Sequence, residues 1–329
     1  MNEMPNNPVW LAPMADITSW PVRKMFFRVG VGLAHTEMVA TRALMERHSS
    51  VFYSLQRHHD EGPLVLQLFS GDVASLLEAA QEAYRISSFE ALSINMACPS
   101  KKVMASGGGA SLINRPNVAA EMIRQAQKLG FPIWVKTRIP SRNLKDVASW
   151  CDLLISAGAD KVALHGRTVS QGYKGSSDRN IVGEAARAFP GKITGTGDVF
   201  TSDDVLDYLE KGCIGVLVAR GALKDPFIVL DALAKLGFRN GRKATFEFQR
   251  EIFRSFLSDL CQVKDNLAMH LLRRFLSCIF KGMPGASQLR SSMARAHGIT
   301  QAFELFNSFA NNFSDFCAKE EAMNEHRKH

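Results

Sequence analysis

The chain has 329 residues, of which 46% are hydrophobic and 22% are charged, so it can bury a full core and whole-chain disorder is excluded. Its length suits either one barrel-sized domain with a smaller one or two medium domains. Forty Lys and Arg residues against 32 Asp and Glu residues give a formal charge of +8, which favours an anionic partner, either a nucleic acid or a phosphorylated small molecule.

The apolar runs and the cysteines indicate in which cellular compartment the protein is expected. No run reaches the about 18 apolar residues of a membrane span, and the first residues lack the basic and then apolar layout of a signal peptide. The six cysteines are far apart with no CxxC pair, which argues against a disulfide framework and against a zinc site. We therefore expect a cytoplasmic protein with no metal site and no membrane partner.

Short apolar runs alternate with longer amphipathic stretches through about the first 240 residues. Eight of these runs are predicted strands: Val9–Pro13, Leu33–Met38, Leu64–Phe69, Ala91–Met96, Ile133–Arg138, Lys161–His165, Lys192–Gly195 and Ile214–Ala219. Three intervening stretches carry helix-boundary residues: Val73–Arg85 after Asp72, Val118–Leu129 before Gly130, and Asp203–Glu210 after Thr201 and Ser202. This alternation predicts an α/β fold closed as a TIM (β/α)8 barrel, because a doubly wound sheet usually has fewer strands.

The strand pattern stops after about Phe238, and apolar residues then recur at helical spacing. The segment from Gly282 to Gly285 interrupts this spacing, and Leu289–Ala296 resumes it. Between Lys243 and Arg295 there are nine Lys and Arg residues against four Asp and Glu residues. We predict a barrel domain over residues 1–240 and a small, basic helical domain over residues 241–329.

Polar residues stand at the ends of several predicted strands, where barrels place their chemistry. Gln67 lies in the third strand, Asn95 and Cys98 end the fourth, Lys136 lies in the fifth and His165 ends the sixth. Polar groups at the ends of apolar runs need partners, and a bound polar cofactor would supply them. Salt bridges across the barrel mouth would explain one or two of these residues, but not all of them at once.

The seventh and eighth strands end in glycines and one arginine. Gly195, Gly197 and Asp198 follow one strand, and Ala219 and Arg220 follow the next. These two loops form the usual phosphate site of barrels, because glycine admits backbone N–H groups and arginine supplies a fork of donors. A large cofactor held by phosphate at one end and by polar side chains at the other suggests FMN.

Several motifs extend this pattern from Leu11 to about Ala296. They are APM at Ala12–Met14, NxxCPSK at Asn95–Lys101, SGGGASL at Ser106–Leu112, VKTR at Val135–Arg138, HGRTxxQGYKG at His165–Gly175, GD at Gly197–Asp198, ARGA at Ala219–Ala222 and RRFLSCIFKGMPGA at Arg273–Ala286. On these motifs the chain resembles the dihydrouridine synthases, flavoenzymes that reduce uridine in tRNA.

The resemblance implies a TIM barrel that carries FMN and a helical domain that helps to hold the RNA. NADPH, or alternatively NADH, would be the reductant. No obligate protein partner is evident from the sequence. It assigns Cys98 as the catalytic acid and Asn95 as the residue that orients the target base. The residues that it assigns to the flavin are Pro13, Met14 and Ala15 along the ring, Gln67, Lys136 and His165 as hydrogen-bond partners of the ring, and Gly197, Asp198, Ala219 and Arg220 at the phosphate. We further predict RNA contacts by Lys101, Arg273 and Arg274, with the apolar residues around the two arginines forming core.

The sequence departs from the family pattern at several positions. Ser93 stands where the family commonly has aspartate, Ala97 where it has glycine, and Thr196 where it has asparagine. These three changes bear on flavin binding. Phe275, Cys278 and Ile279 stand where the helical signature often has histidine and aromatic residues, which bears on RNA specificity.

The residues fit the reduction of a uracil C5–C6 bond, which needs a hydride at C6 and a proton at C5. Reduced FMN would supply the hydride, and a thiol, which is mostly protonated at neutral pH, can supply the proton. Three alternatives stay open: the same chemistry on ribosomal RNA, a flavin barrel that reduces a small molecule, as in dihydroorotate dehydrogenases or ene-reductases, and a non-catalytic RNA-binding flavoprotein. The second alternative leaves the basic helical domain without a purpose.

Overall fold

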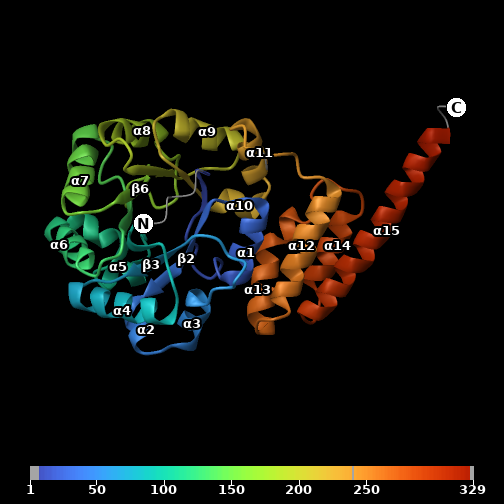
Figure 1. Ribbon diagram of the computed structural model, residues 1–329, viewed down its shortest axis with the longest axis horizontal. Coiled ribbons are helices and arrows are strands. Elements are labelled where there is room, and N and C mark those ends of the chain that lie inside the picture. The colour runs from blue at the N-terminus through green and yellow to red at the C-terminus, as the bar shows by residue number, and fades with distance from the viewer. Residues whose placement is uncertain (1–6, 239–240, 327–329) are drawn as a thin grey trace. The chain divides into compact units, whose positions relative to one another are not determined.

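The protein is described here by a computed structural model, which covers residues 7–238 and 241–326. Eight parallel strands close into one barrel in which each strand pairs with the next and the last pairs with the first (Figure 1). The strands are β1 (Val9–Leu11), β2 (Leu33–Ala40), β3 (Leu64–Phe69), β4 (Ala91–Met96), β5 (Ile133–Arg138), β6 (Lys161–His165), β7 (Ile193–Thr196) and β8 (Val216–Val218). The predicted TIM barrel is confirmed, and β3 to β6 have the predicted bounds.

Helices follow the strands and surround the barrel (Figure 1). They are α1 (Trp20–Val29), α2 (Thr41–Met45), α3 (Ser49–Leu55), α4 (Val73–Ile86), α5 (Lys101–Ala105), η1 (Gly109–Asn114), α6 (Pro116–Gln127), α7 (Leu144–Ser156), α8 (Arg179–Ala188), α9 (Ser202–Glu210), α10 (Arg220–Lys224) and α11 (Ile228–Lys235). Asp72 caps α4 by accepting from the Ser75 N–H, as the sequence predicted. Helix α9 begins at Ser202, one residue before the predicted start, and Thr201 and Asp204 form a capping box on it.

The interior of the barrel has an apolar layer near the N-terminal ends of its strands. The rings of Trp10 and Trp134 stack with their centroids 5.6 Å apart, and Leu33, Val65 and Leu217 complete the layer. Trp134 is the second residue of β5, whereas Lys136 and Arg138 lie further along the same strand. The apolar layer therefore closes one end of the barrel, and polar residues occupy the other end.

The strand register sets these polar residues beside one another. The paired positions are Gln67 with Ser93, Asn95 with Lys136, Arg138 with His165, and His165 with Thr196. Parallel strands end at the same edge, so residues that are 26 to 41 positions apart in the sequence become neighbours.

A second compact unit begins at Ala244, and we refer to it as the helical unit. It contains α12 (Phe246–Leu260), α13 (Asp265–Phe275), η2 (Leu276–Cys278), α14 (Ala286–Ala294) and α15 (Ile299–His326). The buried ring of Phe280 lies at its centre, against Phe246, Phe253, Phe306 and Phe309. None of the helices in the described residues is long and apolar enough to cross a lipid bilayer.

Candidate active site

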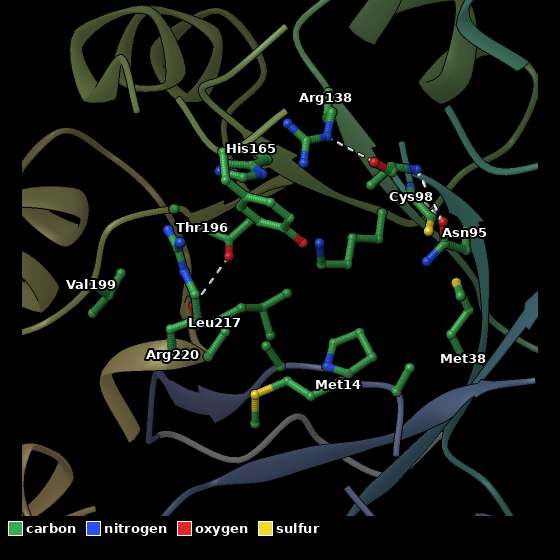
Figure 2. A pocket seen from close by; sticks show the side chains of 18 of the residues that line it. Met14, Met38, Asn95, Cys98, Arg138, His165, Thr196, Val199, Leu217 and Arg220 are labelled. Atoms are coloured by element: carbon green, nitrogen blue, oxygen red, sulfur yellow. Dashed lines mark hydrogen bonds between the residues drawn. The ribbon is translucent and has the colours of Figure 1, made fainter. Parts of the chain in front are cut away.

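A cavity of about 350 Å³ opens at the C-terminal ends of the strands (Figure 2). All eight strands or the loops that follow them contribute lining residues. The lining includes every residue that the sequence assigned to catalysis or to the flavin, and one of the predicted RNA contacts: Pro13, Met14, Ala15, Gln67, Asn95, Cys98, Lys136, His165, Gly197, Asp198, Ala219 and Arg220. Lys101 lies on α5, and Arg273 and Arg274 lie on α13, outside this lining.

A chain of side-chain hydrogen bonds runs along one wall of the cavity. The Gln67 Nε2 donates to the Ser93 Oγ at 3.1 Å, and the Asn95 Nδ2 donates to the Gln67 Oε1 at 2.8 Å. The Asn95 Oδ1 in turn accepts from the backbone N–H groups of Ala97 and Cys98, at 3.1 and 3.0 Å. This chain fixes which way both amides face and holds the loop that carries the Cys98 thiol.

The same bonds limit what the two amides can offer a ligand. An amide has two N–H donors and an oxygen with two lone pairs. Asn95 uses both lone pairs on the Cys98 loop and one N–H on Gln67, so one N–H remains. Gln67 retains one N–H and one lone pair. Ser93, one of the departures from the family pattern, serves here as the acceptor that orients Gln67.

Lys136 stands on β5 and lines the cavity. Within residues 7–238 and 241–326, its ammonium has no hydrogen bond and no anionic partner. Burial and, to a smaller extent, the nearby Arg138 guanidinium together lower the pKa of Lys136 to about 8. A half-buried lysine whose ammonium has no counter-charge favours an anionic or electron-rich ligand beside it.

The His165 imidazole is buried at the end of β6. Burial, together with the positive charges of Lys136, Arg138, Arg167 and Arg220, lowers its pKa to about 2. The ring is therefore neutral at physiological pH and can donate one hydrogen bond.

Asp198 organises two arginines at the phosphate end of the cavity. Its carboxylate accepts from Arg167 at 2.9 and 2.6 Å and from Arg220 at 3.0 Å, and it also accepts from the Ser177 N–H at 2.8 Å. These bonds hold the pKa of Asp198 below its usual value despite burial, so it is an anion. A carboxylate repels phosphate, so a phosphate bound here would need Arg220 and backbone N–H groups as its donors, and Asp198 positions Arg220.

Aromatic and cationic side chains pack against one another beside Asp198, at the same end of the cavity. Arg138 and Arg220 lie against the Tyr173 ring, at 5.5 and 4.9 Å from its centroid, and Arg220 also lies 5.7 Å from the Phe200 centroid. Tyr173 is 62% exposed. Sequence reasoning assigned no role to Arg138, Arg167 or Tyr173, although each lies in a motif that it recognised.

The lining fits a flavin mononucleotide. The donor set comprises the free amide hydrogen of Gln67, the Lys136 ammonium and the His165 N–H, and it matches the carbonyl and nitrogen acceptors of a flavin ring. Met14, Met38 and Leu217 add apolar surface, and Arg220 adds a donor fork for a phosphate. The unpaired ammonium of Lys136 is the observation that most needs such a ligand.

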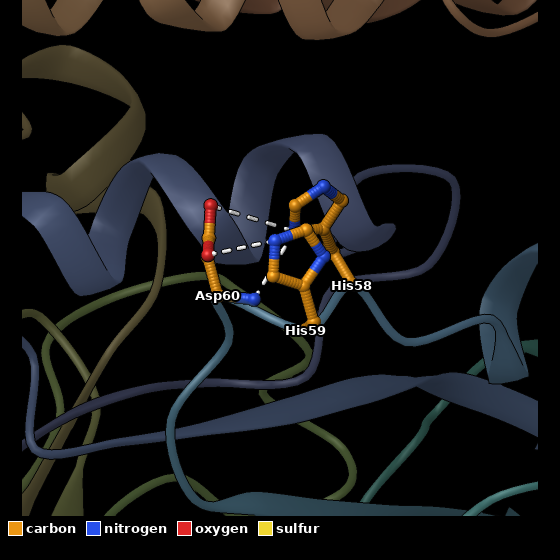
Figure 3. A group of neighbouring side chains, drawn as sticks. All are labelled: His58, His59 and Asp60. Atoms are coloured by element: carbon orange, nitrogen blue, oxygen red, sulfur yellow. Dashed lines mark hydrogen bonds and ion pairs between the residues drawn. The ribbon is translucent and has the colours of Figure 1, made fainter.

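A separate cluster lies on the segment between α3 and β3 and contains His58, His59 and Asp60 (Figure 3). The His59 Nε2 lies 3.1 Å from the Asp60 carboxylate, and the Asp60 N–H donates to the His58 Nδ1 at 3.1 Å. The Lys24 ammonium approaches the His58 Nε2 at 3.4 Å and Asp60 at 3.6 Å. These pairings account for the cluster without an ion.

The helical unit carries the two predicted RNA-contacting arginines on α13. Arg273 and Arg274 are exposed, whereas Leu271, Leu272 and Phe275 beside them are fully buried. The apolar residues are core, as predicted, and the charges face solvent.

Comparisons with known proteins agree with these features. A family model described as "Dihydrouridine synthase (Dus)" matches residues 10–317. A protein of Rhodobacter capsulatus named "Probable tRNA-dihydrouridine synthase" is 30% identical over 298 residues, covering 88% of this chain and 90% of that protein. A Synechocystis protein named "Probable tRNA-dihydrouridine synthase 1" is 27% identical over 303 residues, covering 90% and 84%. The crystal structure of TcOYE with pHBA is similar in fold, with a TM-score of 0.51 at 9% identity, covering 74% of this chain and 92% of that one.

Proposed function

The chain belongs to the dihydrouridine synthase family, and on that premise we propose that it reduces uridines in tRNA to 5,6-dihydrouridine, with FMN as its cofactor and NADPH as the reductant. One observation carries the proposal: the Cys98 thiol lines the same cavity as the unpaired Lys136 ammonium and the neutral His165 ring. A proton donor and a set of donors suited to a flavin therefore share one space.

Bound and reduced, FMN would supply the hydride that is added at C6 of the uracil. The Cys98 thiol would give its proton to C5, and the bonds from Asn95 to the backbone of Ala97 and Cys98 hold this thiol in place. The remaining N–H of Asn95 would donate to an acceptor on the base. The target base must leave its stack to enter the cavity, which is easier in a loop than in a duplex.

The residues proposed to hold the cofactor divide between its two ends. Pro13, Met14 and Ala15 would line the ring, and Gln67, Lys136 and His165 would donate to it. Gly197, Ala219 and Arg220 would hold the phosphate, with Asp198 fixing Arg220. The free lone pair and N–H of Gln67 suit a flavin edge that has both a donor and an acceptor.

The helical unit is proposed to hold the RNA backbone, through Arg273 and Arg274, with Lys101 as a contact on the barrel. The barrel with its FMN would span about residues 1–240, and the RNA-binding part residues 241–329. Exposed arginines suit phosphate contacts, which supply most of the affinity for nucleic acid without reading sequence. The names of the two relatives favour tRNA over ribosomal RNA as the substrate.

The test starts from the purified protein, its released flavin and its RNA products. We expect FMN on denaturation, and dihydrouridine in tRNA from cells that lack this gene after incubation with the protein and NADPH, measured by mass spectrometry of nucleosides. Ribosomal RNA from the same cells and NADH in place of NADPH are the parallel arms. Dihydrouridine in ribosomal RNA alone would replace the substrate, and a protein that neither carries nor takes up FMN would overturn the proposal.

A further inference from the structure

Arg167 lies beside the imidazole of His165, two residues earlier in the chain. We propose that Arg167 is a positioning residue that keeps His165 as the tautomer with its proton on Nδ1, so that this N–H is offered to the cavity. The inference rests on the proposed function only for the identity of the acceptor, a flavin.

The hydrogen bond between the two side chains decides the tautomer. The Arg167 Nη1 lies 3.3 Å from the His165 Nε2. A guanidinium has five N–H donors and no acceptor, and it stays charged in proteins. The Nε2 must therefore be the acceptor, and the single proton of the neutral ring must sit on Nδ1.

The position of Gly197 shows independently which edge of the ring faces the protein. A Cβ added to Gly197 would lie 2.4 Å from the His165 Cδ2 and 2.7 Å from its Nε2, so the backbone of Gly197 packs against that edge. The φ of Gly197 is +115°, which a residue with a side chain rarely adopts. Because Arg167 and Gly197 cover the Nε2 edge, the Nδ1 edge is left for the cavity that His165 lines (Figure 2).

Several hydrogen bonds fix the Arg167 side chain in its position beside the His165 ring. Both oxygens of the Asp198 carboxylate accept from its two terminal nitrogens, and the carbonyl oxygens of Lys174 and Gly175 accept from its Nε and Nη2, at 3.3 and 2.6 Å. The side chain is only 3% exposed. These four bonds fix the orientation of the guanidinium, so that its Nη1 points toward the His165 Nε2.

The charges around His165 exclude the doubly protonated ring. Lys136 and Arg138 face it from β5, Arg167 from the following loop and Arg220 from α10, and the negative charge of Asp198 is taken up by Arg167 and Arg220. Only the choice between the two neutral tautomers is left, and Arg167 makes that choice. The opposite tautomer would turn a lone pair toward the acceptors of a flavin and would repel them.

The test reads the tautomer directly, by long-range ¹H–¹⁵N NMR of the flavin-free protein labelled in its nine histidines. The His165 signals are assigned by their loss in His165→Asn. We expect the Nδ1–H tautomer with no titration between about pH 5 and 9. In Arg167→Met we expect the Nε2–H form or a mixture, whereas Arg167→Lys, which keeps a donor and the charge, restores the Nδ1–H form.

Arg179→Met is the matched control, because Arg179 supports the same loop through the Asp198 carbonyl and through Asp204 without a hydrogen bond to His165. We expect this control to keep the wild-type tautomer. In Arg167→Met the affinity for FMN should fall about tenfold, which corresponds to the loss of one hydrogen bond, and Arg167→Lys should recover most of it.

An Nε2–H ring in the wild type, or an unchanged tautomer in Arg167→Met, would overturn the inference. If Arg167→Met does not fold, the wild-type spectrum and Arg167→Lys still decide it. Because the spectra need no RNA and no turnover, a protein that fails to reduce tRNA but shows the Nδ1–H ring would overturn the proposed function alone.

Discussion

The Asn95 Nδ2 donates to the Gln67 Oε1 at 2.8 Å, although the two residues are 28 positions apart in the sequence. Both side chains are nearly fully buried, and both line the cavity. The bond links a residue proposed to contact the flavin with the residue that holds the Cys98 loop. The position of the proposed proton donor and that of the proposed cofactor wall are therefore set by one pair of amides.

Asn95→Ala should weaken both the support of the Cys98 loop and the orientation of Gln67. It removes the acceptor of two backbone N–H groups and leaves the Gln67 Oε1 without its donor, so we expect a loss of about 1–3 kcal/mol in the free energy of unfolding. Dihydrouridine formation should fall as well, because the Cys98 loop loses its support. Chemical denaturation and turnover measure the two effects. Gln125→Ala, which removes an amide that pairs only with Glu121, is the control and should change stability by less than about 0.5 kcal/mol.

Cys98→Ala should retain its flavin and the reduction of that flavin by NADPH, while dihydrouridine formation falls by about 10²–10⁴-fold. Only the proton donor to C5 is removed, and neither flavin nor nicotinamide chemistry uses it. Stopped-flow absorbance follows flavin reduction, and nucleoside mass spectrometry follows the product. Cys261→Ala, at an exposed cysteine of the helical unit, should behave as wild type. Full activity of Cys98→Ala on tRNA would assign the proton to another group.

Lys136→Met should stabilise the flavin-free protein and weaken its binding of FMN. The pKa of Lys136 falls from 10.5 to about 8 on folding, so between these values the unfolded chain binds a proton that the folded chain does not. The stability of the wild type therefore rises with pH across this window, and the advantage of Lys136→Met, greatest below about pH 8, shrinks as the pH approaches 10.5. Denaturation midpoints at pH 7 and 10 check the sign. Lys145→Met, at an exposed lysine, should show no such dependence.

Replacing Arg273 and Arg274 together by glutamine should weaken tRNA binding and flatten its salt dependence, by up to about one unit of log–log slope per lost phosphate contact. FMN content and NADPH oxidation should not change, because the cavity is lined by barrel residues. Filter binding at several salt concentrations gives both quantities. Lys128→Gln with Lys145→Gln, at an exposed lysine directly after α6 and an exposed lysine of α7, controls for the loss of charge alone. An unchanged slope would place the RNA surface around Lys101, Lys102 and Lys174.

Local patterns were enough to predict the barrel, but not the exact ends of its first two and last two strands. Strands β3 to β6 have the predicted bounds because apolar runs and paired residues coincide there. The eighth strand was predicted as Ile214–Ala219 and spans only Val216–Val218, because a strand ends where its neighbours stop pairing with it. Helix α6 starts at Pro116 and not at Val118, since proline suits the first helical position.

The predicted site residues line one cavity because their motifs stand at the C-terminal ends of the strands. The alternation of apolar runs and amphipathic stretches in the sequence was enough to locate those ends. The support for those residues was not predictable in the same way. The contacts of Arg167 with Asp198 and of Ser93 with Gln67 span 31 and 26 positions and depend on strand register and rotamers. The sequence shows Arg167 as part of a motif, but its partner Asp198 can be identified only from the three-dimensional structure of the barrel.

The buried Arg138 has a consequence for how the specificity of this enzyme can change. Its Nε donates to the Ala97 carbonyl at 2.8 Å, next to Cys98 (Figure 2). Its Nη1 donates to the carbonyls of Thr168 and Gly172, at 3.3 and 2.8 Å. The Arg138 guanidinium thus links, by hydrogen bonds, the backbone beside the Cys98 thiol to the loop that carries Tyr173. Insertions or deletions between Thr168 and Gly172 would withdraw acceptors from Arg138 and shift the thiol. New substrate preferences should therefore arise by exchange of side chains on this loop at constant length, in evolution as in the laboratory.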